Sequence, residues 1–206
     1  MNPVDRAQRA VTPGKTPRTV RAVRADEWGR AKRLRLEALR DPAAPVAYLD
    51  TYENAVGRPD SFWRERAEQS ARGTSARHFV AETADGVWVG AVVVLVEPKG
   101  SAGVLGVPGE CDQAHLVGVY VRPDHRGTGL LKELFDAATG WAWSLEEPRV
   151  ERVRLHVDER NGRARAAYAK LGFEPTGVTV PVESDPSARE LELTVTRPGD
   201  SPRDRA

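Results

Sequence analysis

The chain has 206 residues, a length typical of one domain. Its 31 lysine and arginine residues nearly balance 30 aspartate and glutamate residues, and the formal net charge of +1 argues against a dedicated nucleic-acid-binding protein. A single cysteine excludes an internal disulfide and a cysteine-rich zinc site. Because the longest apolar run, Val87 to Val96, has about half the length of a membrane span and the N-terminus lacks a secretory-signal pattern, we expect a soluble, cytoplasmic protein with no membrane or nucleic-acid partner.

Both ends of the chain, residues 1–17 and 198–206, are rich in proline and arginine and poor in aliphatic residues. Such segments bury too little apolar surface to offset the entropy lost on ordering. We therefore predict two disordered tails around one domain, residues 18–197.

The first half of this domain predicts alternating strands and helices. A short strand over 19–23 precedes a helix that starts near Asp26 and ends before Pro42, and a second helix opens at Pro59 with Trp63 on its inner, core-facing side. Two apolar runs, 77–83 and 87–96, flank Asp85-Gly86 and predict a hairpin. The glycine-rich segment 98–112 predicts a loop.

The second half begins with a predicted strand over 114–121, and simple alternation places four of its residues on one face: His115, Val117, Val119 and Val121. The run Arg126-Gly-Thr-Gly-Leu-Leu131 then opens a helix with an apolar stripe. A strand, a glycine turn and a helix in succession present free backbone amides at a positive helix end, which suits a phosphate. A dinucleotide-binding Rossmann unit is disfavoured, because the full Gly-x-Gly-x-x-Gly is missing and a hairpin precedes the turn.

A further strand is predicted over 152–157, followed by a helix with Asn161 as its N-cap. Ala164, Tyr168 and Leu171 share a face of this helix, and Gly172 provides its stop.

At this point the sequence resembles the GCN5-related N-acetyltransferases, which move an acetyl group from acetyl-CoA to an amine. The resemblance spans roughly residues 115 to 175 and depends on three blocks, namely Val119 to Pro123, Arg126 to Gly129, and Asn161 to Phe173. It implies an α+β fold, an α/β/α sandwich. The central sheet would be mixed and mostly antiparallel, with about six or seven strands splayed between strands 4 and 5, accompanied by about four helices.

The resemblance also implies a binding site for acetyl-CoA as co-substrate. Main-chain groups of the strand would pair with the pantetheine arm, and amides of the glycine turn would hold the diphosphate. Asn161 and Ala164 would lie beside the pantetheine arm, although Asn161 is equally a plain helix cap. The strand residues implied are Val119, Tyr120 and Val121, and those of the turn are Arg126, Gly127, Thr128, Gly129, Leu130 and Leu131. The family usually has glycine or alanine where this chain has Leu131, so this side chain either packs inward or crowds the cofactor.

For catalysis, the resemblance implies that Tyr168 lies near the thioester sulfur, where its hydroxyl would protonate the leaving thiolate. His115 occupies the position at which many relatives carry a glutamate, so it is the candidate base, acting directly or through water. A histidine that merely lines the cleft is the other interpretation, and Glu110 and Asp112 are alternative bases. The histidines show no metal-binding spacing, and we expect no metal.

The acceptor is the least determined part of the prediction. Tyr48, Asp50 and Glu53 lie in the region that walls the acceptor side of such folds, where carboxylates beside aromatics suit a small cationic amine; Trp63 is more readily a core residue. A small-molecule amine is therefore the expected substrate. A peptide or protein amine, a non-catalytic acyl-CoA-binding sensor or scaffold, and a cofactor-free partner-binding protein are the alternatives, and a homodimer is left open.

Overall fold

The computed structural model describes residues 17–182 and 185–199. The tails predicted over 1–17 and 198–206 fall outside these residues, except for 17, 198 and 199.

Seven strands form one sheet in the order β1-β2-β3-β4-β5-β7-β6. Neighbours are antiparallel except for the parallel pair β4 and β5, which confirms the predicted mixed, mostly antiparallel sheet. The strands are β1 (Arg18–Ala22), β2 (Ala76–Thr83), β3 (Trp88–Glu97), β4 (Gln113–Val121), β5 (Arg152–Asp158), β6 (Glu174–Val182) and β7 (Asp185–Thr196).

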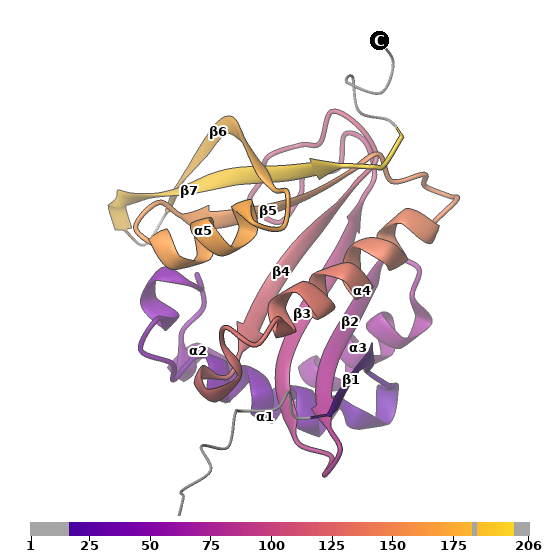
Figure 1. Ribbon diagram of the computed structural model, residues 1–206, viewed down its shortest axis with the longest axis vertical. Coiled ribbons are helices and arrows are strands. Elements are labelled where there is room, and N and C mark those ends of the chain that lie inside the picture. The colour runs from indigo at the N-terminus through magenta and orange to yellow at the C-terminus, as the bar shows by residue number, and fades with distance from the viewer. Residues whose placement is uncertain (1–16, 183–184, 200–206) are drawn as a thin grey trace, which may run out of the picture.

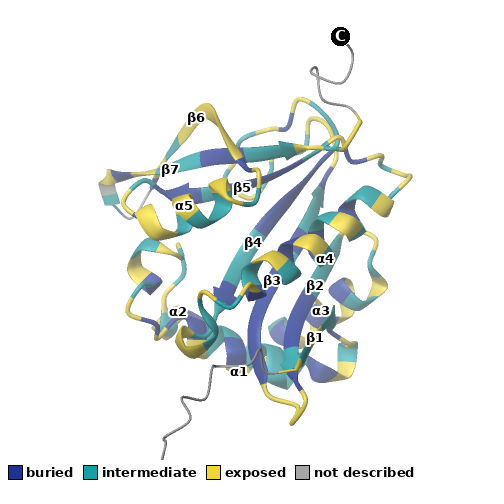
Figure 2. Cartoon of the chain, viewed as in Figure 1, coloured by how far each residue is buried: buried dark blue, intermediate teal, exposed yellow. Residues whose placement is uncertain are grey.

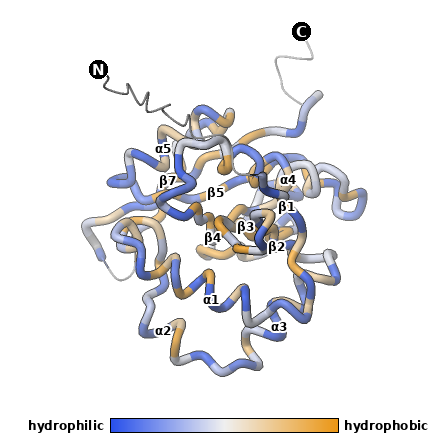
Figure 3. Tube along the Cα trace, turned by 60° about the horizontal axis from the view of Figure 1, so that its bottom comes forward, coloured by the Kyte–Doolittle hydropathy of each residue, from blue (hydrophilic) through white to orange (hydrophobic). Residues whose placement is uncertain are grey.

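Helices cover both faces of this sheet, as Figures 1 and 3 show. On one face lie α4 (Leu130–Ser144) and α5 (Gly162–Ala169), and on the other α1 (Trp28–Ala38) and α3 (Asp60–Arg72). The described residues contain five α-helices, one more than expected, because α2 (Tyr52–Gly57) is a six-residue helix in a predicted loop. Thr51 caps α2 by accepting a hydrogen bond from the Asn54 amide at 3.2 Å. No helix in the described part of the chain is long and apolar enough to cross a bilayer.

The apolar stripe of α4 explains the larger part of the core. Its inward residues Leu130, Leu134 and Phe135 are at most 2% exposed and pack against strands β2 to β5. On the opposite face, Leu34 of α1 packs against β2 and β3, and Trp63 of α3 is buried in a separate cluster, as predicted for a core residue. Figure 2 shows the resulting burial of the central strands beneath helices with exposed outer faces.

The strands β4 and β5 pair only at one end. Their ladder runs from Gln113 opposite Arg152 to Leu116 opposite Leu155, although both strands continue beyond it. Figure 1 shows the two strands diverging from this end. The predicted splay between the fourth and fifth strands is therefore confirmed.

A bulge at Gly118 changes the faces of β4. Gly118 has φ +61°, and the register with β3 shifts between Ala91 and Val93. As a result Leu116 and Val119 both pack against the core beneath α4, whereas His115 lies on the opposite face. The prediction that His115, Val117, Val119 and Val121 share one face was wrong, because uninterrupted alternation does not hold across a bulge.

Leu134→Ala should destabilise the fold by about 2–5 kcal/mol, because it removes a side chain that is 0% exposed and leaves a cavity beneath α4. Urea unfolding measures the free energy directly. Leu49→Ala is the matched control, since Leu49 is 53% exposed, and it should change stability by less than about 0.5 kcal/mol. Equal losses in the two variants would contradict this assignment of the core.

Candidate active site

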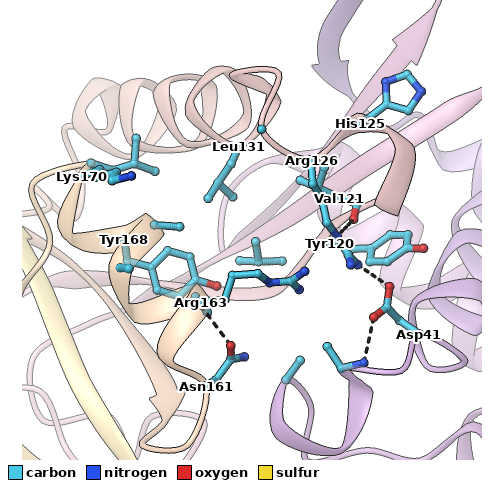
Figure 4. Close-up of a pocket in the computed structure, with 18 of the residues that line it drawn as sticks. Asp41, Tyr120, Val121, His125, Arg126, Leu131, Asn161, Arg163, Tyr168 and Lys170 are labelled. Atoms are coloured by element: carbon cyan, nitrogen blue, oxygen red, sulfur yellow. Dashed lines mark hydrogen bonds and ion pairs between the residues drawn. The ribbon is translucent and has the colours of Figure 1, made fainter.

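A cavity of about 520 Å³ lies where β4 has separated from β5. It is lined by the end of β4, the turn before α4, the inner face of α5 and the segment after α1. Figure 4 shows side chains from these elements converging on it. The residues predicted at separate points of the sequence that meet here are Tyr48, Val119, Tyr120, Val121, Arg126, Gly127, Gly129, Leu131, Asn161, Ala164 and Tyr168.

The N-terminus of α4 presents unpaired backbone amides to this cavity. Among the described residues, the first backbone bond into the helix is from the Glu133 amide to the Gly129 carbonyl at 3.2 Å, so the amides of 127–132 have no backbone acceptor. Gly127 and Gly129 make the turn with φ +75° and +85°, a region that favours glycine. A row of free amides at the positive end of a 15-residue helix is suited to an anion.

The side chain of Arg126 is already engaged. Its Nε donates to the Val121 carbonyl at 2.9 Å, and one of its terminal nitrogens pairs with Asp41, as Figure 4 shows. Arg126 can thus contribute to an anion site mainly through its backbone amide and through the positive charge of its guanidinium. Four more basic residues line the cavity that sequence reasoning did not single out, namely His125, Lys132, Arg163 and Lys170.

Two residues of the turn that were expected to bind the cofactor, Thr128 and Leu130, do not line the cavity. Leu130 is 1% exposed and belongs to the core, and the Thr128 hydroxyl donates to the His125 carbonyl at 2.7 Å. Leu131, by contrast, both packs against the core cluster and lines the cavity, into which Figure 4 shows it pointing. Leu131 therefore packs inward, as one of the two alternatives expects, while part of its side chain faces the cavity; crowding of the cofactor stays a prediction.

The free edge of β4 offers amides rather than carbonyls. The Arg122 amide donates to the Val89 carbonyl of β3 at 2.9 Å, so by alternation the main-chain groups of Val121 and Val119 point to the edge that β5 has left. Their carbonyls accept hydrogen bonds from Arg126 and, at 2.8 Å, from the Tyr48 hydroxyl. The two amides remain directed into the cavity.

Asn161 fixes the opposite wall. Its side-chain oxygen accepts a hydrogen bond from the Ala164 amide at 3.1 Å, which confirms the predicted N-cap of α5. Its side-chain nitrogen donates to the Val46 carbonyl at 3.1 Å, and so ties the segment after α1 to α5. Asn161 thereby holds the two sides of the cavity at a fixed separation.

Tyr168 stands at the inner end of the cavity. Its ring stacks on Phe135 of α4, with centroids 5.4 Å apart and planes 19° apart. Its hydroxyl makes no hydrogen bond with any residue that the structure describes, and Figure 4 shows the ring directed into the cavity. Burial raises the pKa of Tyr168 above its usual value, so the hydroxyl is protonated at neutral pH.

A second cavity of about 60 Å³ adjoins the first, and Tyr168, Val119 and Asn161 line both. Its remaining polar residues are His156 and Asp158 of β5 and Glu190 of β7. Sequence reasoning did not single out these three. The strand containing Glu190 has a signal, since Leu191, Leu193 and Val195 alternate with polar residues.

His115 does not line either cavity. It is 2% exposed, and its Nδ1 and Nε2 lie 3.1 Å from Glu97 Oε1 and from His156 Nδ1, respectively. His156 therefore separates His115 from the small cavity. The alternatives Glu110 and Asp112 lie on the 98–112 loop and line neither cavity.

Of the predicted acceptor residues, only Tyr48 reaches the site. The Asp50 carboxylate is paired with Arg58 at 3.0 Å, and Glu53 is exposed in the first turn of α2. Within the described ranges, no group of three or more histidine, cysteine, aspartate or glutamate residues has a geometry that would hold a metal ion.

Comparisons with known proteins agree with this geometry. The Acetyltransferase (GNAT) family matches residues 34–173. A candidate [ribosomal protein bS18]-alanine N-acetyltransferase of Bacillus subtilis is 28% identical over 104 residues, which cover 50% of this chain and 67% of that protein.

Among solved structures, a GNAT acetyltransferase of Streptococcus pneumoniae has a TM-score of 0.69 at 13% identity, covering 88% of this chain and 100% of its own. The protein yncA of Salmonella typhimurium, solved with its cofactor acetyl-CoA, has a TM-score of 0.64 at 16% identity and covers 87% of this chain and 94% of its own. A chimera of the spermidine N-acetyltransferase SpeG from Vibrio cholerae and hSSAT has a TM-score of 0.59 at 17% identity, covering 87% and 95%. These structures share the fold. Because the family match covers more than half of the chain, the chain belongs to the acetyltransferase (GNAT) family and is an acyl-CoA-dependent N-acetyltransferase.

Proposed function

We propose that this chain transfers the acetyl group of acetyl-CoA to a small-molecule amine by direct attack, with Tyr168 as the general acid. The observation that carries this proposal is a single cavity with free helix amides at one end and the unpartnered Tyr168 hydroxyl at the other. An anionic group bound at the amides and a reacting group at the tyrosine would thus belong to one elongated ligand.

The residues present fit acetyl-CoA. The amides of 127–132 would hold its diphosphate, with Lys132 and Arg163 nearby as cations. The amides of Val119 and Val121 would pair with the pantetheine arm as an added strand. Acetyl-CoA supplies the thioester, and no covalent enzyme intermediate is required.

At the reacting end, two groups of the chain have separate roles. The Val119 amide would donate a hydrogen bond to the carbonyl oxygen as that oxygen gains charge. The Tyr168 hydroxyl would give its proton to the leaving sulfur. His115, the base expected from sequence, would take part only through His156, which lies between it and the small cavity.

The acceptor is proposed to be small because the second cavity is narrow and contains carboxylates. The spermidine N-acetyltransferase relative is named for a polyamine, whereas the Bacillus subtilis relative is named for a protein alanine. A peptide N-terminus is therefore the second candidate. A panel of spermidine, a peptide with N-terminal alanine and a lysine-containing peptide, scored for released thiol, separates the two. Acetylation of the peptides alone would contradict the small-amine proposal.

Acetyl-CoA should raise the melting temperature, because a ligand bound only to the native state stabilises it by about 2.7 kcal/mol at 100 times its Kd. Differential scanning fluorimetry with increasing acetyl-CoA measures the shift. An unchanged melting temperature at saturation would support a cofactor-free partner-binding protein. A shift without turnover of any amine would support an acyl-CoA-binding sensor or scaffold.

Tyr168→Phe should lower kcat by about 10²–10⁴-fold while acetyl-CoA affinity changes little, because it keeps the ring stacked on Phe135 and removes only the proton donor. Steady-state kinetics and calorimetric titration give the two quantities. Tyr52→Phe is the matched control, since Tyr52 lines neither cavity, and it should retain full activity. Full activity of Tyr168→Phe would show that Tyr168 is only structural.

A further inference from the structure

The small cavity lies between β4 and β5, and residues from both faces of the sheet line it. Val157 and Leu191 pack against the core beneath α4, so the alternate residues His156, Asp158 and Glu190 lie on the opposite face. Tyr168 reaches the same cavity from the α5 side. A ligand entering from the face opposite α4 would therefore meet the carboxylates first and the tyrosine hydroxyl behind them.

Asp158 and Glu190 are directly opposite each other in the β5–β7 ladder, but their partners differ. The Asp158 carboxylate accepts hydrogen bonds from the Arg160 amide at 2.8 Å and from the Arg160 guanidinium at 2.7 Å. Glu190 is half-buried, and its carboxylate makes no hydrogen bond or ion pair with any described residue. The Asp158 carboxylate is therefore occupied by Arg160, whereas the Glu190 carboxylate can accept a proton or a hydrogen bond from a ligand.

We propose that Glu190 is the general base that removes the proton from the acceptor ammonium. This assignment deepens the proposed acetyl transfer and depends on it. The Glu190 side chain lines the cavity that Tyr168 and Val119 also line, so the proposed base, acid and oxyanion donor belong to one small cavity.

The electrostatic surroundings of Glu190 suit this role. Burial, and after it the Asp158 carboxylate, raise the pKa of Glu190 to about 7, and Arg160 opposes this shift only in part. The other titratable groups on the cavity are His156, whose pKa burial lowers to about 4, and Tyr168, so both are neutral at pH 7. The linings from β4 and from the segment after α1 are apolar side chains. A base with a pKa near the working pH is deprotonated in a large fraction of molecules and still binds a proton well.

One N–H bond of the ammonium breaks, its electron pair stays on nitrogen, and Glu190 gains the proton. That pair forms the C–N bond to the thioester carbon as the C–S bond breaks, and the leaving sulfur takes the proton of Tyr168. The nitrogen loses its second proton to the tyrosinate through solvent, and Glu190 releases its proton to water. The products are the amide, the free thiol and one proton.

The histidines are less suited to this step. His115 has partners at both ring nitrogens, and His156 Nδ1 is one of them. The remaining nitrogen of His156, Nε2, is buried and lies 3.8 Å from Glu192, which is bonded to Arg154. Neither histidine presents an accessible nitrogen to the cavity.

Glu190→Gln tests the assignment, with the most active amine of the panel as the probe. At pH 7 we expect kcat to fall by about 10²–10⁴-fold, acetyl-CoA affinity to stay unchanged, and the inflection of kcat/KM near pH 7 to disappear. The deficit should narrow as the pH approaches the pKa of the amine, because more of the amine is then already deprotonated. Glu174→Gln, the same change at an exposed residue of β6 that lines neither cavity, should behave as wild type.

Asp158→Asn tests the assignment through the pH profile of kcat/KM, which would not shift if Glu190 had only a structural role. It removes the charge that raises the pKa of Glu190 and frees Arg160, so the inflection of kcat/KM should shift to lower pH. A wild-type rate in Glu190→Gln, a rise in KM at constant kcat, or loss of the inflection in His115→Gln but not in Glu190→Gln would each overturn the assignment. Acetyl-CoA binding without transfer to any amine of the panel would instead overturn the proposed function itself.

Discussion

The early end of the pairing between β4 and β5 is the constraint on which the site depends. Four residues of each strand form the parallel ladder, and beyond Leu116 and Leu155 the strands part. Main-chain groups at the free edge of β4 would be left unpaired, which is costly for buried backbone. Tyr48 and Arg126 satisfy two of the carbonyls, and the amides stay free. The separation thus yields a largely apolar cavity in which the edge of β4 presents backbone hydrogen-bond donors.

The paired end of the two strands is held by a buried ionic network. Arg154 of β5 donates to Glu97 of β3 at 2.8 Å and to Glu192 of β7 at 2.9 Å, so one guanidinium joins strands on both sides of the splay. His115 extends this network through Glu97. Because removing one partner of a buried ion pair leaves an uncompensated charge, such a network holds the strands in one arrangement. His115, the residue predicted as the base, therefore belongs to the network that holds the paired end of β4 and β5.

Local chemistry made part of the fold predictable. The apolar stripe of α4, the glycine turn before it and the Asn161 cap depend on neighbouring residues, and each was confirmed. The face of His115 was predicted wrongly because strict alternation was assumed along β4. A glycine inside a strand indicates either a bulge or close packing, and only the pairing with β3 shows that Gly118 forms a bulge. The position of Glu190 depends on β7 entering the sheet beside β5, a contact distant in the chain. Motifs therefore predicted many of the residues that line the large cavity, whereas only the topology brings Asp158 and Glu190 to the small one.

The two cavities differ in charge, and this difference matches the two substrates of an acetyl transfer. Lys132, Arg163 and Lys170 line the large cavity, where a diphosphate would bind, whereas Asp158 and Glu190 line the small one. Basic side chains beside the diphosphate and carboxylates beside the ammonium would favour an anionic donor in the large cavity and a cationic acceptor at the small one. Both substrates would then meet at Tyr168, which lines both cavities together with Val119 and Asn161.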